Sequence, residues 1–365
     1  MMKVTLTNEI LSYITEIEHN RYKVSSVKLS KPVMNRLRKN SKKKSSYASN
    51  KIEGNPLSEK QVDEVIERDE RKHYLKPEQE VRNYFLALNY LEEKVSKKEK
   101  FSQKLILDVQ KLVEKGASKE KIGLRGSMPP GVLFAVYDSK TGNPDYIPPE
   151  YCDIPELLDE LVEYVNTTDD HPLIVAAVVH YQLVTIHPFE DGNGRTARLL
   201  SGYIMDLNGY GFNGIGSLEE YFAYDIDEYY ESIQMGLPAL YYSGRENPPH
   251  PEIWINYFLR MVKLYSGKVC DLQLASEEDI AGSLSFLKGK EKELLQFLIR
   301  NYRGEFTPIE VSRELSVSNK TVINRLAVLV KNGFAVPVFA NKRIRSYELS
   351  EFTKDHQKEI MKEIS

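Results

Sequence analysis

The chain has 365 residues, of which 41% are hydrophobic and 28% charged, a composition that suits two or three soluble domains with a sizeable core. Its 50 basic and 53 acidic residues nearly cancel, which excludes a global attraction to DNA or anionic membranes and leaves only local basic patches. Two cysteines, Cys152 and Cys270, are too few for a disulfide scaffold and fit a reducing compartment.

No stretch of the chain predicts targeting or membrane insertion. The N-terminal residues MMKVTLTNEI are polar and lack the apolar core of a signal peptide. The longest apolar run, residues 172–186, is shorter than the ~20 residues that span a bilayer, and it contains His180 and Gln182. We therefore expect a cytoplasmic protein without a membrane partner.

The N-terminal third of the chain reads as helices. LTNEILSYITEIEHN has apolar residues at helical spacing, with Asn8 as its candidate cap. A short helix is predicted to end at Gly54, with the lysines at 42–44 as its solvated start. Ser58 begins a capping pattern ahead of the next helix. A longer helix follows over KPEQEVRNYFLALNYLEEKVS, and its apolar stripe comprises Val81, Tyr84, Phe85, Leu88 and Leu91.

Residues 126–150 interrupt this helical pattern. They contain prolines and β-forming residues on either side of the glycine-containing stretch 138–143. We expect a hairpin that pairs residues 132–137 with 145–147 and turns at that stretch; a plain surface loop is the alternative. Helical periodicity resumes after residue 150.

The C-terminal part reads as a separate unit. KEKELLQFLIRNY, TPIEVSRELSV and SNKTVINRLAVLVKNG predict three helices, the last of which is capped by Ser318 and stopped by Gly333. FAVPVFANKRIRSYELS then alternates like a hairpin, and this order is typical of a winged helix-turn-helix. The residues expected to face DNA are Asn319, Lys320, Thr321 and Asn324 on the third helix and Lys342, Arg343 and Arg345 on the wing. Protein contacts or dimerisation remain the alternative use of this domain.

The stretch HPFEDGNGRTARLL, residues 187–200, follows the most apolar run of the chain. Gly192 and Gly194 flank Asn193 just before a predicted helix, and a glycine turn at a helix N-terminus presents unpaired amides and a positive dipole to phosphate. Arg195 and Arg198 lie three residues apart on one helix face, which indicates more than one phosphate group.

Two further groups complete this candidate nucleotide site. Asp191 offers a hard oxygen ligand for Mg²⁺, which commonly accompanies polyphosphates. His187 is a candidate general base for a hydroxyl nucleophile. The chain has neither the Gly-Lys-Ser/Thr of a P-loop nor the dinucleotide-binding glycine pattern. For any single residue a plain turn or a surface charge is an alternative, but the joint pattern favours a functional site.

HPFEDGNGRTAR resembles the Fic motif, His-x-Phe-x-(Asp/Glu)-Gly-Asn-Gly-Arg-x-x-Arg, without departure, and the resemblance extends over residues 45–265. It implies an all-α Fic core with a β-hairpin flap, beside the small α+β winged-helix domain. The expected domains are 1–110, with an inhibitory helix at 42–54, then 111–268 and 285–350. Most Fic proteins transfer AMP from ATP to a Ser, Thr or Tyr hydroxyl of a target protein, so ATP, Mg²⁺ and such a target are implied. The flap would clamp the target by strand addition.

The resemblance also implies roles for single residues. His187 would be the base and Asp191 the Mg²⁺ ligand, while Phe189 would anchor the loop. The groups that would bind the phosphates are Asn193 and the amides of Gly192 and Gly194 for the α- and β-phosphates, Arg195 for the β-phosphate and Arg198 for the γ-phosphate. Tyr229 and Tyr230 would border the adenine pocket, with core packing as the alternative. His180, two turns before His187, is expected to be a buried, hydrogen-bonded histidine, in preference to a metal ligand.

A second motif, SNKIEGN at residues 49–55, predicts regulation. Glu53 stands at the unfavourable end of the helix dipole, a position that invites a cationic partner. The pattern from Ser49 to Gly54 resembles the family's inhibitory motif, (Ser/Thr)-x-x-x-Glu-(Gly/Asn). It implies that Glu53 pairs with Arg198 and takes the place of the γ-phosphate.

Three alternatives to an inhibited adenylyltransferase stay open. Glu53 could orient a water that removes AMP from a modified protein. The same site could transfer another phosphate-containing group, such as phosphocholine or UMP. The Fic core could instead serve as a nucleotide sensor for a DNA-binding regulator, although a sensor has no need of His187 as a base. The resemblance to Fic proteins also favours a homodimer, but no surface patch that would form the interface can be identified from the sequence.

Overall fold

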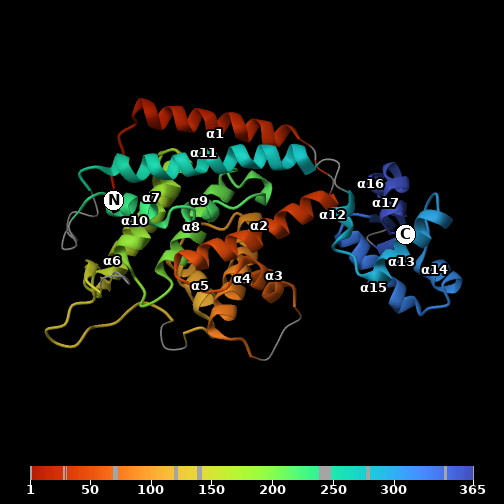
Figure 1. The fold of residues 1–365 in the computed structure, drawn as a ribbon, viewed down its shortest axis with the longest axis horizontal. Coiled ribbons are helices and arrows are strands. Elements are labelled where there is room, and N and C mark those ends of the chain that lie inside the picture. The colour runs from red at the N-terminus through yellow and green to blue at the C-terminus, as the bar shows by residue number, and fades with distance from the viewer. Residues whose placement is uncertain are drawn as a thin grey trace. The chain divides into compact units, whose positions relative to one another are not determined.

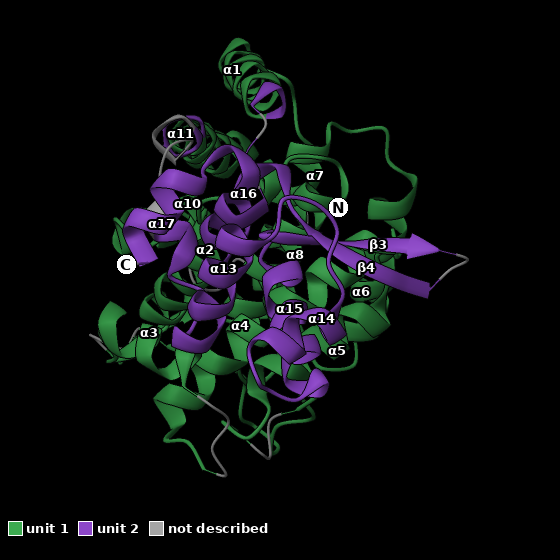
Figure 2. Cartoon of the chain, turned by 90° about the vertical axis from the view of Figure 1, so that its right-hand side faces the viewer, with its two compact units in different colours: residues 1–24, 40–269 green, residues 25–39, 270–365 purple. Residues whose placement is uncertain are grey.

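The computed structural model describes residues 2–27, 29, 31–68, 73–118, 122–137, 142–237, 248–276, 280–340 and 343–364. The chain forms two compact units, which Figure 2 distinguishes by colour. The first unit comprises residues 1–24 and 40–269, and the second comprises residues 25–39 and 270–365. The described residues are mostly helical, and their two sheets are two-stranded antiparallel hairpins, so the expected mostly helical fold is confirmed.

Two buried helices form the centre of the first unit. α7 (Pro172–Ile186) is apolar on all its faces and buried around its circumference, as expected for a central helix. α8 (Asn193–Leu207) packs extensively against it. Around this pair lie α4 (Lys76–Ser96), α5 (Gln103–Glu114) and α6 (Ile154–Thr167). The motif loop between α7 and α8 is therefore held at both ends by rigid, buried elements.

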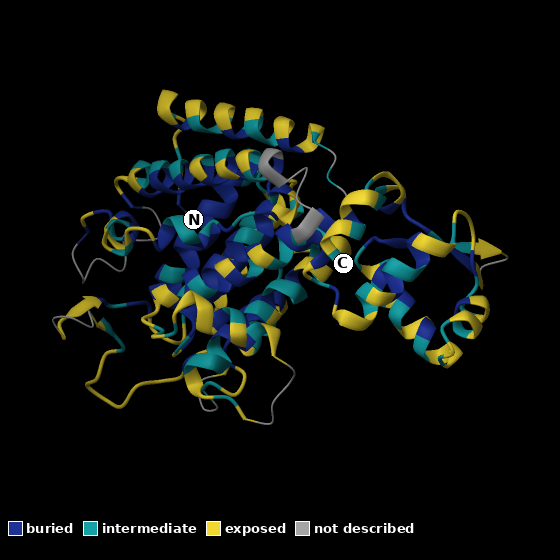
Figure 3. Ribbon diagram, turned by 45° about the vertical axis from the view of Figure 1, so that its right-hand side comes forward, coloured by how far each residue is buried: buried dark blue, intermediate teal, exposed yellow. Residues whose placement is uncertain are grey.

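The N-terminal helix α1 (Asn8–Ser26) lies beside α11 (Pro251–Ser276), as Figure 1 shows. In the first unit the two helices are joined by polar contacts, such as Lys263 Nζ to Glu16 Oε2 at 2.8 Å. The outer face of α1 is exposed (Figure 3), so α1 is a surface helix. Thr7 accepts a hydrogen bond from the Ile10 amide at 3.2 Å, so the predicted cap at Asn8 was wrong by one residue.

Helix α2 (Lys31–Ile52) is much longer than the sequence predicts. The lysines at 42–44 lie in its middle, and each pairs with a carboxylate of another helix of the first unit. Lys42 lies 2.5 Å from Glu92 of α4, Lys43 lies 2.6 Å from Glu67 of α3 (Glu59–Glu67), and Lys44 lies 3.0 Å from Glu220 of α9 (Glu219–Phe222). The predicted solvated helix start was therefore wrong, because partners distant in sequence fix the lysine run. The predicted cap of α3 by Ser58 is confirmed.

The predicted hairpin is present but shorter than expected. β1 (Val136–Tyr137) pairs antiparallel with β2 (Pro144–Tyr146). Residues 132–135 lie outside the ladder, since continuing the register beyond Val136 and Tyr146 would bring them opposite Pro148 and Pro149, which have no amide to donate. Most of the predicted turn, residues 138–141, lies outside the described residues.

The first unit is completed by η1 (Phe212–Gly214) and α10 (Ile226–Gln234), which supplies Tyr229 and Tyr230. Among the residues that the structure describes, no helix combines the length and apolar character required to cross a bilayer.

The second unit has the predicted order of elements. α13 (Gly289–Asn301), α14 (Pro308–Glu314) and α15 (Asn319–Lys331) precede the hairpin of β3 (Ala335–Ala340) and β4 (Arg343–Leu349). Ser318 caps α15, as predicted. Three short helices were not predicted: α12 (Ile280–Leu284), α16 (Glu351–Asp355) and α17 (Gln357–Ile364). Ile360 of α17 is fully buried in the core of this unit, so the tail belongs to the domain. Lys342 lies outside the described residues.

Candidate active site

His187 occupies the end of α7 in the left-handed backbone region, with φ 49° and ψ 56°. Its Nδ1 lies 3.2 Å from the carbonyl oxygen of Val184. Because a carbonyl can only accept a hydrogen bond, Nδ1 carries the proton and Nε2 keeps its lone pair. The carbonyl of His187 in turn accepts from Arg125 Nε at 2.8 Å. The Val184 carbonyl thus holds the imidazole in the tautomer that a general base requires, while Arg125 anchors the backbone of His187.

Burial lowers the pKa of His187 to about 4, and the hydrogen bond to Val184 opposes this shift. The residue is nevertheless partly exposed where it lines a cavity, and contact with water limits the effect of burial. We therefore place its pKa between about 4 and the ordinary value of 6.5. His187 is neutral at pH 7 in either limit.

The turn after His187 is closed by its own side chains. Phe189 is buried, and its amide donates to Asn193 Oδ1 at 3.0 Å while its carbonyl accepts from Asn193 Nδ2 at 2.8 Å. The amide group of Asn193 therefore shapes the loop. Gly192, with φ 81°, precedes α8 and has no side chain to cap it. The first amides of α8 thus stand at a helix start without a side-chain cap, an arrangement that suits an anion.

Asp191 lies at the rim of this turn and fits a magnesium ion. Its Oδ1 accepts from the Gly192 amide at 2.8 Å and lies 3.2 Å from Arg195 Nη2. The described residues contain no group of three or more metal-binding side chains. Mg²⁺ is commonly held by one or two carboxylates together with substrate phosphates and water. A lone carboxylate beside an anion-binding turn is therefore suited to a Mg²⁺ ion that arrives with a polyphosphate.

Arg198 is buried, and residues of α2 surround its guanidinium. Nε donates to Ser49 Oγ at 2.8 Å, and Nη2 donates to the Ser49 carbonyl at 3.0 Å. Nη2 also lies 2.6 Å from Glu53 Oε1, and Nη1 donates to Tyr229 Oη at 3.3 Å. The Glu53–Arg198 contact that the inhibitory motif implies is thus present. Burial acts to lower the pKa of Arg198, but Tyr229 and Glu53 outweigh it and hold the pKa above its usual range.

Gly194 allows this contact to form. A Cβ at position 194 would lie 2.4 Å from Glu53 Oε1 and 3.1 Å from Arg198 Nη1. Gly54, with φ +79°, ends α2 just after Glu53 in a conformation that favours glycine. The two glycines therefore place Glu53 directly against the start of α8.

A cavity of about 160 Å³ brings the predicted residues together. Its lining includes Glu53, Asp145, Tyr146, His187, Asn193, Gly194, Arg198, Tyr229 and Tyr230. Pockets for drug-sized ligands are usually roughly 300–1,000 Å³, so this cavity is smaller than such a pocket. Asp191, Gly192 and Arg195 belong to the same loop but not to this lining.

The two predicted tyrosines differ in exposure. Tyr229 is 1% exposed and Tyr230 is 43% exposed. Tyr229 Oη lies 2.8 Å from His180 Nε2, so the expectation of a buried, hydrogen-bonded His180 is confirmed. Burial lowers the pKa of His180 well below its ordinary value, and the neutral Nε2 can accept the tyrosine proton. Tyr229 can then accept from Arg198, so it combines core packing with a place at the cavity wall.

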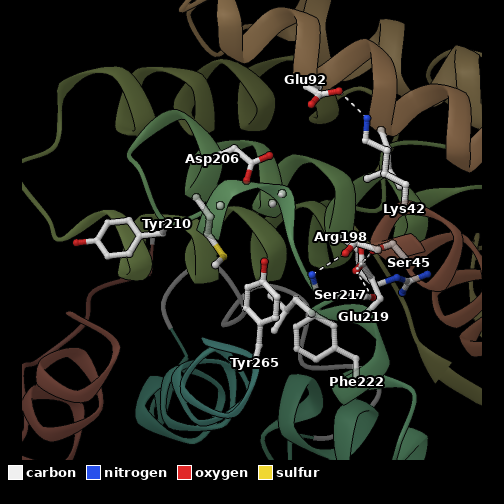
Figure 4. Close-up of a pocket in the computed structure, with 18 residues that line it drawn as sticks. Lys42, Ser45, Glu92, Arg198, Asp206, Tyr210, Ser217, Glu219, Phe222 and Tyr265 are labelled. Carbon is white, nitrogen blue, oxygen red and sulfur yellow. Dashed lines mark hydrogen bonds and ion pairs between the residues drawn. The ribbon is translucent and has the colours of Figure 1, made fainter. Parts of the chain in front are cut away.

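Glu219 is a residue of this region that the sequence did not indicate. Its carboxylate accepts hydrogen bonds from Tyr84 Oη at 2.9 Å, from Ser45 Oγ at 2.8 Å and from Ser217 Oγ at 3.0 Å. It borders a second cavity, of about 130 Å³, whose wall also includes Arg198 (Figure 4). Glu219 therefore links α2 to α4 and α9 next to the Glu53–Arg198 contact.

Arg195 does not line the cavity. Its Nη2 lies 2.9 Å from Oε1 of Glu114, a fully buried residue at the end of α5. Burial raises the pKa of Glu114 to about 7, while the charge of Arg195 opposes the shift. Neither Glu114 nor Arg125 was predicted, because nothing in their local sequence sets them apart from ordinary helix and loop residues.

Fold and site together define a mostly helical domain with a glycine-containing turn at a helix N-terminus beside a partly exposed histidine. Residues 57–205 match the family model described as Fic/DOC family. The chain therefore carries a Fic/DOC domain, and this domain includes the whole motif loop.

Curated relatives match parts of the chain. "Protein adenylyltransferase fic-1" of Caenorhabditis elegans is 46% identical over 67 residues, which are 18% of this chain and 13% of that protein. "Protein adenylyltransferase Fic" of Drosophila grimshawi is 27% identical over 206 residues, 54% of this chain and 40% of that protein. The chain thus spans less than half the length of these relatives.

Solved structures show the same fold. A Fic family protein from Desulfovibrio desulfuricans G20 superimposes with a TM-score of 0.60 at 20% identity, covering 96% of this chain and 98% of that chain. A fragment of Fic-1 from C. elegans superimposes with a TM-score of 0.56 at 24% identity, covering 73% and 72% of the two chains.

Proposed function

We propose that this chain is a protein adenylyltransferase restrained by Glu53, which transfers AMP from ATP to a Ser, Thr or Tyr hydroxyl of a target protein or of itself. The observation that carries the proposal is the convergence of His187, the start of α8 and the buried Arg198 on one cavity. The printed names of the matching relatives support AMP as the transferred group.

The chemistry requires a nucleophile, a phosphate cradle and a leaving group. The hydroxyl oxygen of the target would attack the α-phosphorus, and the bond to pyrophosphate would break as the new P–O bond forms. Nε2 of His187 would take the hydroxyl proton. The amides at the start of α8 would stabilise the charge on the phosphate oxygens, and the rigid helices on either side would keep the reacting atoms aligned. Mg²⁺, held by Asp191, would supply further charge neutralisation.

Glu53 would act by competition. Arg198 is the buried cation that could meet the γ-phosphate, and Glu53 and Ser49 together occupy its Nε and Nη2. ATP could bind productively only after Glu53 leaves. Inhibition by Glu53 would therefore act on Arg198, the cation that ATP needs, while His187 remains in its reactive tautomer.

Intact-mass spectrometry of the chain and of lysate proteins tests the proposal. Incubation of the Glu53→Gly variant with Mg²⁺ and ATP should add one adenylyl unit, while UTP and CDP-choline should add nothing. A uridylyl or phosphocholine increment would assign a different transferred group. Release of AMP from a pre-adenylylated target, without any transfer, would favour the reverse reaction.

The pH dependence of transfer is a further prediction. A general base acts in its neutral form, and the pKa of His187 lies below its ordinary value of 6.5. The value of kcat/KM should therefore stay constant between pH 8 and pH 7, and it should decrease only below about pH 6.5. Initial rates measured in constant-ionic-strength buffers check this. An acid limb centred above pH 7 would contradict the assignment of His187 as the base.

We further propose that the second unit is a winged-helix domain that binds DNA. Its order of helices and hairpin supports the fold, and the exposed cations Lys320, Arg343 and Arg345 support contact with phosphates. In gel-shift titrations the full-length chain should bind duplex DNA with an affinity that falls steeply with salt. Replacing these three cations with alanine should reduce the salt slope by about three units.

The matched control for the DNA experiment replaces three exposed lysines of the first unit, Lys97, Lys98 and Lys104. This variant should retain the salt slope of the parent. Equal slopes for both triple variants would assign any DNA binding to general surface charge and would leave the second unit as a protein-contact domain.

A further inference from the structure

Glu114 is a buried acid at the back of the phosphate-binding turn. It is the last residue of α5, its side chain is completely buried, and its Oε1 lies 2.9 Å from Arg195 Nη2. Neither of its oxygens has a well-angled hydrogen bond among the described residues. The charge of Arg195 is therefore the main compensation for burying this carboxylate.

Arg195 connects Glu114 to the candidate magnesium ligand. Nη2 lies between Glu114 Oε1, at 2.9 Å, and Asp191 Oδ1, at 3.2 Å. Nη1 lies 3.9 Å from Glu80 of α4. A guanidinium is planar and rigid, so fixing one edge of it fixes the direction in which its other donors point. Glu114 therefore controls where Arg195 holds the Asp191 carboxylate.

The same face of α5 also braces the backbone of the loop. Gln110, four residues before Glu114, donates from Nε2 to the Asp191 carbonyl at 3.2 Å. Glu114 itself packs closely on the turn, because a Cβ at position 192 would lie 2.6 Å from its Oε1. Two side chains one helical turn apart thus hold both the main chain and, through Arg195, the side chain of Asp191.

Two other uses of this cluster fit the structure less well. Three carboxylates, those of Glu80, Glu114 and Asp191, could suggest a cation site, but Arg195 occupies the space among them, and the described residues contain no cluster of three or more metal-binding side chains. Arg195 could also contact a phosphate, since its Nε and Nη1 have no hydrogen-bond partner among the described residues, but its Nη2 is committed to Glu114 and Asp191. A link from Glu114 of α5 through Arg195 to Asp191 accounts for these contacts.

We infer that Glu114 is a positioning residue of the active site, which acts through Arg195 to orient the Asp191 carboxylate toward the metal–nucleotide complex. This inference rests on the proposed function for the identity of that ligand. Partners that only orient a metal ligand commonly change metal affinity by about 10–100-fold when they are replaced.

The experiment measures Mn²⁺ binding in the presence of ATP by electron paramagnetic resonance, in the Glu53→Gly background. Glu114→Gln, which removes the charge and keeps the shape, should raise the Mn²⁺ dissociation constant by about tenfold or more. Glu114→Asp, which keeps the charge but withdraws it, should give a smaller increase. The control is Asp108→Asn on the same helix, whose carboxylate pairs with the exposed Lys104, and it should bind Mn²⁺ like the parent.

A double-mutant cycle separates orientation from general damage. Once Asp191 is replaced with alanine, Glu114→Gln should have no further effect on Mn²⁺ binding. The inference would be overturned if folded Glu114→Gln bound Mn²⁺ with an affinity within about twofold of the parent. It would also be overturned if Glu114→Gln weakened Mn²⁺ binding as much in the protein without Asp191 as in the protein that retains it. If Glu114→Gln fails to fold, the same comparison of Mn²⁺ affinities is made with Glu114→Asp. Absence of AMP transfer combined with Glu114-dependent Mn²⁺ binding would reject the proposed function and leave this inference standing.

Discussion

Replacing Glu53 with glycine is expected to raise AMP incorporation by at least about tenfold, equivalent to about 1.4 kcal/mol of inhibition removed. Glu53 Oε1 lies 2.6 Å from Nη2 of the buried Arg198, and because the Glu53 side chain is itself 31% exposed, solvent weakens this pair relative to a fully buried one. Once the carboxylate is gone, the γ-phosphate becomes the available anionic partner of Arg198. Labelling with α-³²P-ATP, on the chain itself and in lysate, measures the increase.

Thermal unfolding provides a second readout of the same variant. Without Glu53, Arg198 loses its carboxylate partner, so the ligand-free variant should unfold at a lower temperature than the parent. ATP with Mg²⁺ should stabilise the variant more than the parent, because a ligand stabilises the state that it binds.

The matched control for Glu53 is Glu67→Gly, which removes a glutamate from the end of another helix, α3. It should lower stability without raising incorporation. A Glu53→Gly protein that labels itself and lysate proteins no better than the parent would show that the carboxylate does not restrain the enzyme.

Replacing His187 with alanine should reduce transfer by about 10²–10⁴-fold, the usual contribution of a positioned general base. The effect should be measured in the Glu53→Gly background, where activity is high enough to quantify such a loss. Binding of ATP, followed by its effect on the unfolding temperature, should change little, because His187 is assigned to the hydroxyl and not to the phosphates. The expected result is thus a loss of kcat with nucleotide affinity retained.

His250→Ala is the control for this substitution, since His250 is an exposed histidine of the first unit. It should label like the Glu53→Gly parent. If His187→Ala labelled proteins at a rate within about tenfold of the Glu53→Gly parent, His187 would not be the general base. Alignment of the reactants and charge stabilisation would then be the main sources of the rate.

The candidate site could be predicted largely because its groups lie in one short stretch of sequence. His187, the glycine turn and the start of α8 follow each other directly, so local rules about helix termini describe their arrangement. The Glu53–Arg198 contact joins residues 145 positions apart and was predicted only from the resemblance to a known motif. Helices α13, α14 and α15 and the hairpin of the second unit were predicted because each has a cap or a clear periodicity, whereas the short helices α12, α16 and α17 were not.

Helix α2 shows why other parts of the fold could not be predicted. Its buried face includes Ser45, Ser46, Ser49 and Asn50, so the usual pattern of apolar residues is missing. Ser45 and Ser49 bond to groups from distant segments, Glu219 and Arg198, whereas Ser46 and Asn50 donate to carbonyls within α2. Burial of a polar helix face depends on tertiary partners, and a local sequence pattern does not contain them.

The buried acids Glu114 and Glu219 escaped prediction for a related reason. An acidic residue is ordinarily assigned to the surface, and only a tertiary partner makes its burial affordable. Arg195 and a set of hydroxyl groups supply those partners here.

The membership of residues 25–39 in the second unit bears on how the protein can be shortened. Asn35 of α2 donates to the Lys331 carbonyl at 2.9 Å, and Lys31 and Pro32 pack against Gly333. A truncation after residue 269 would remove these anchors and leave the opening turns of α2 to fray. Glu53 directly follows the other end of that helix. A shortened enzyme would therefore lack the second unit and would also have a less firmly held helix before Glu53.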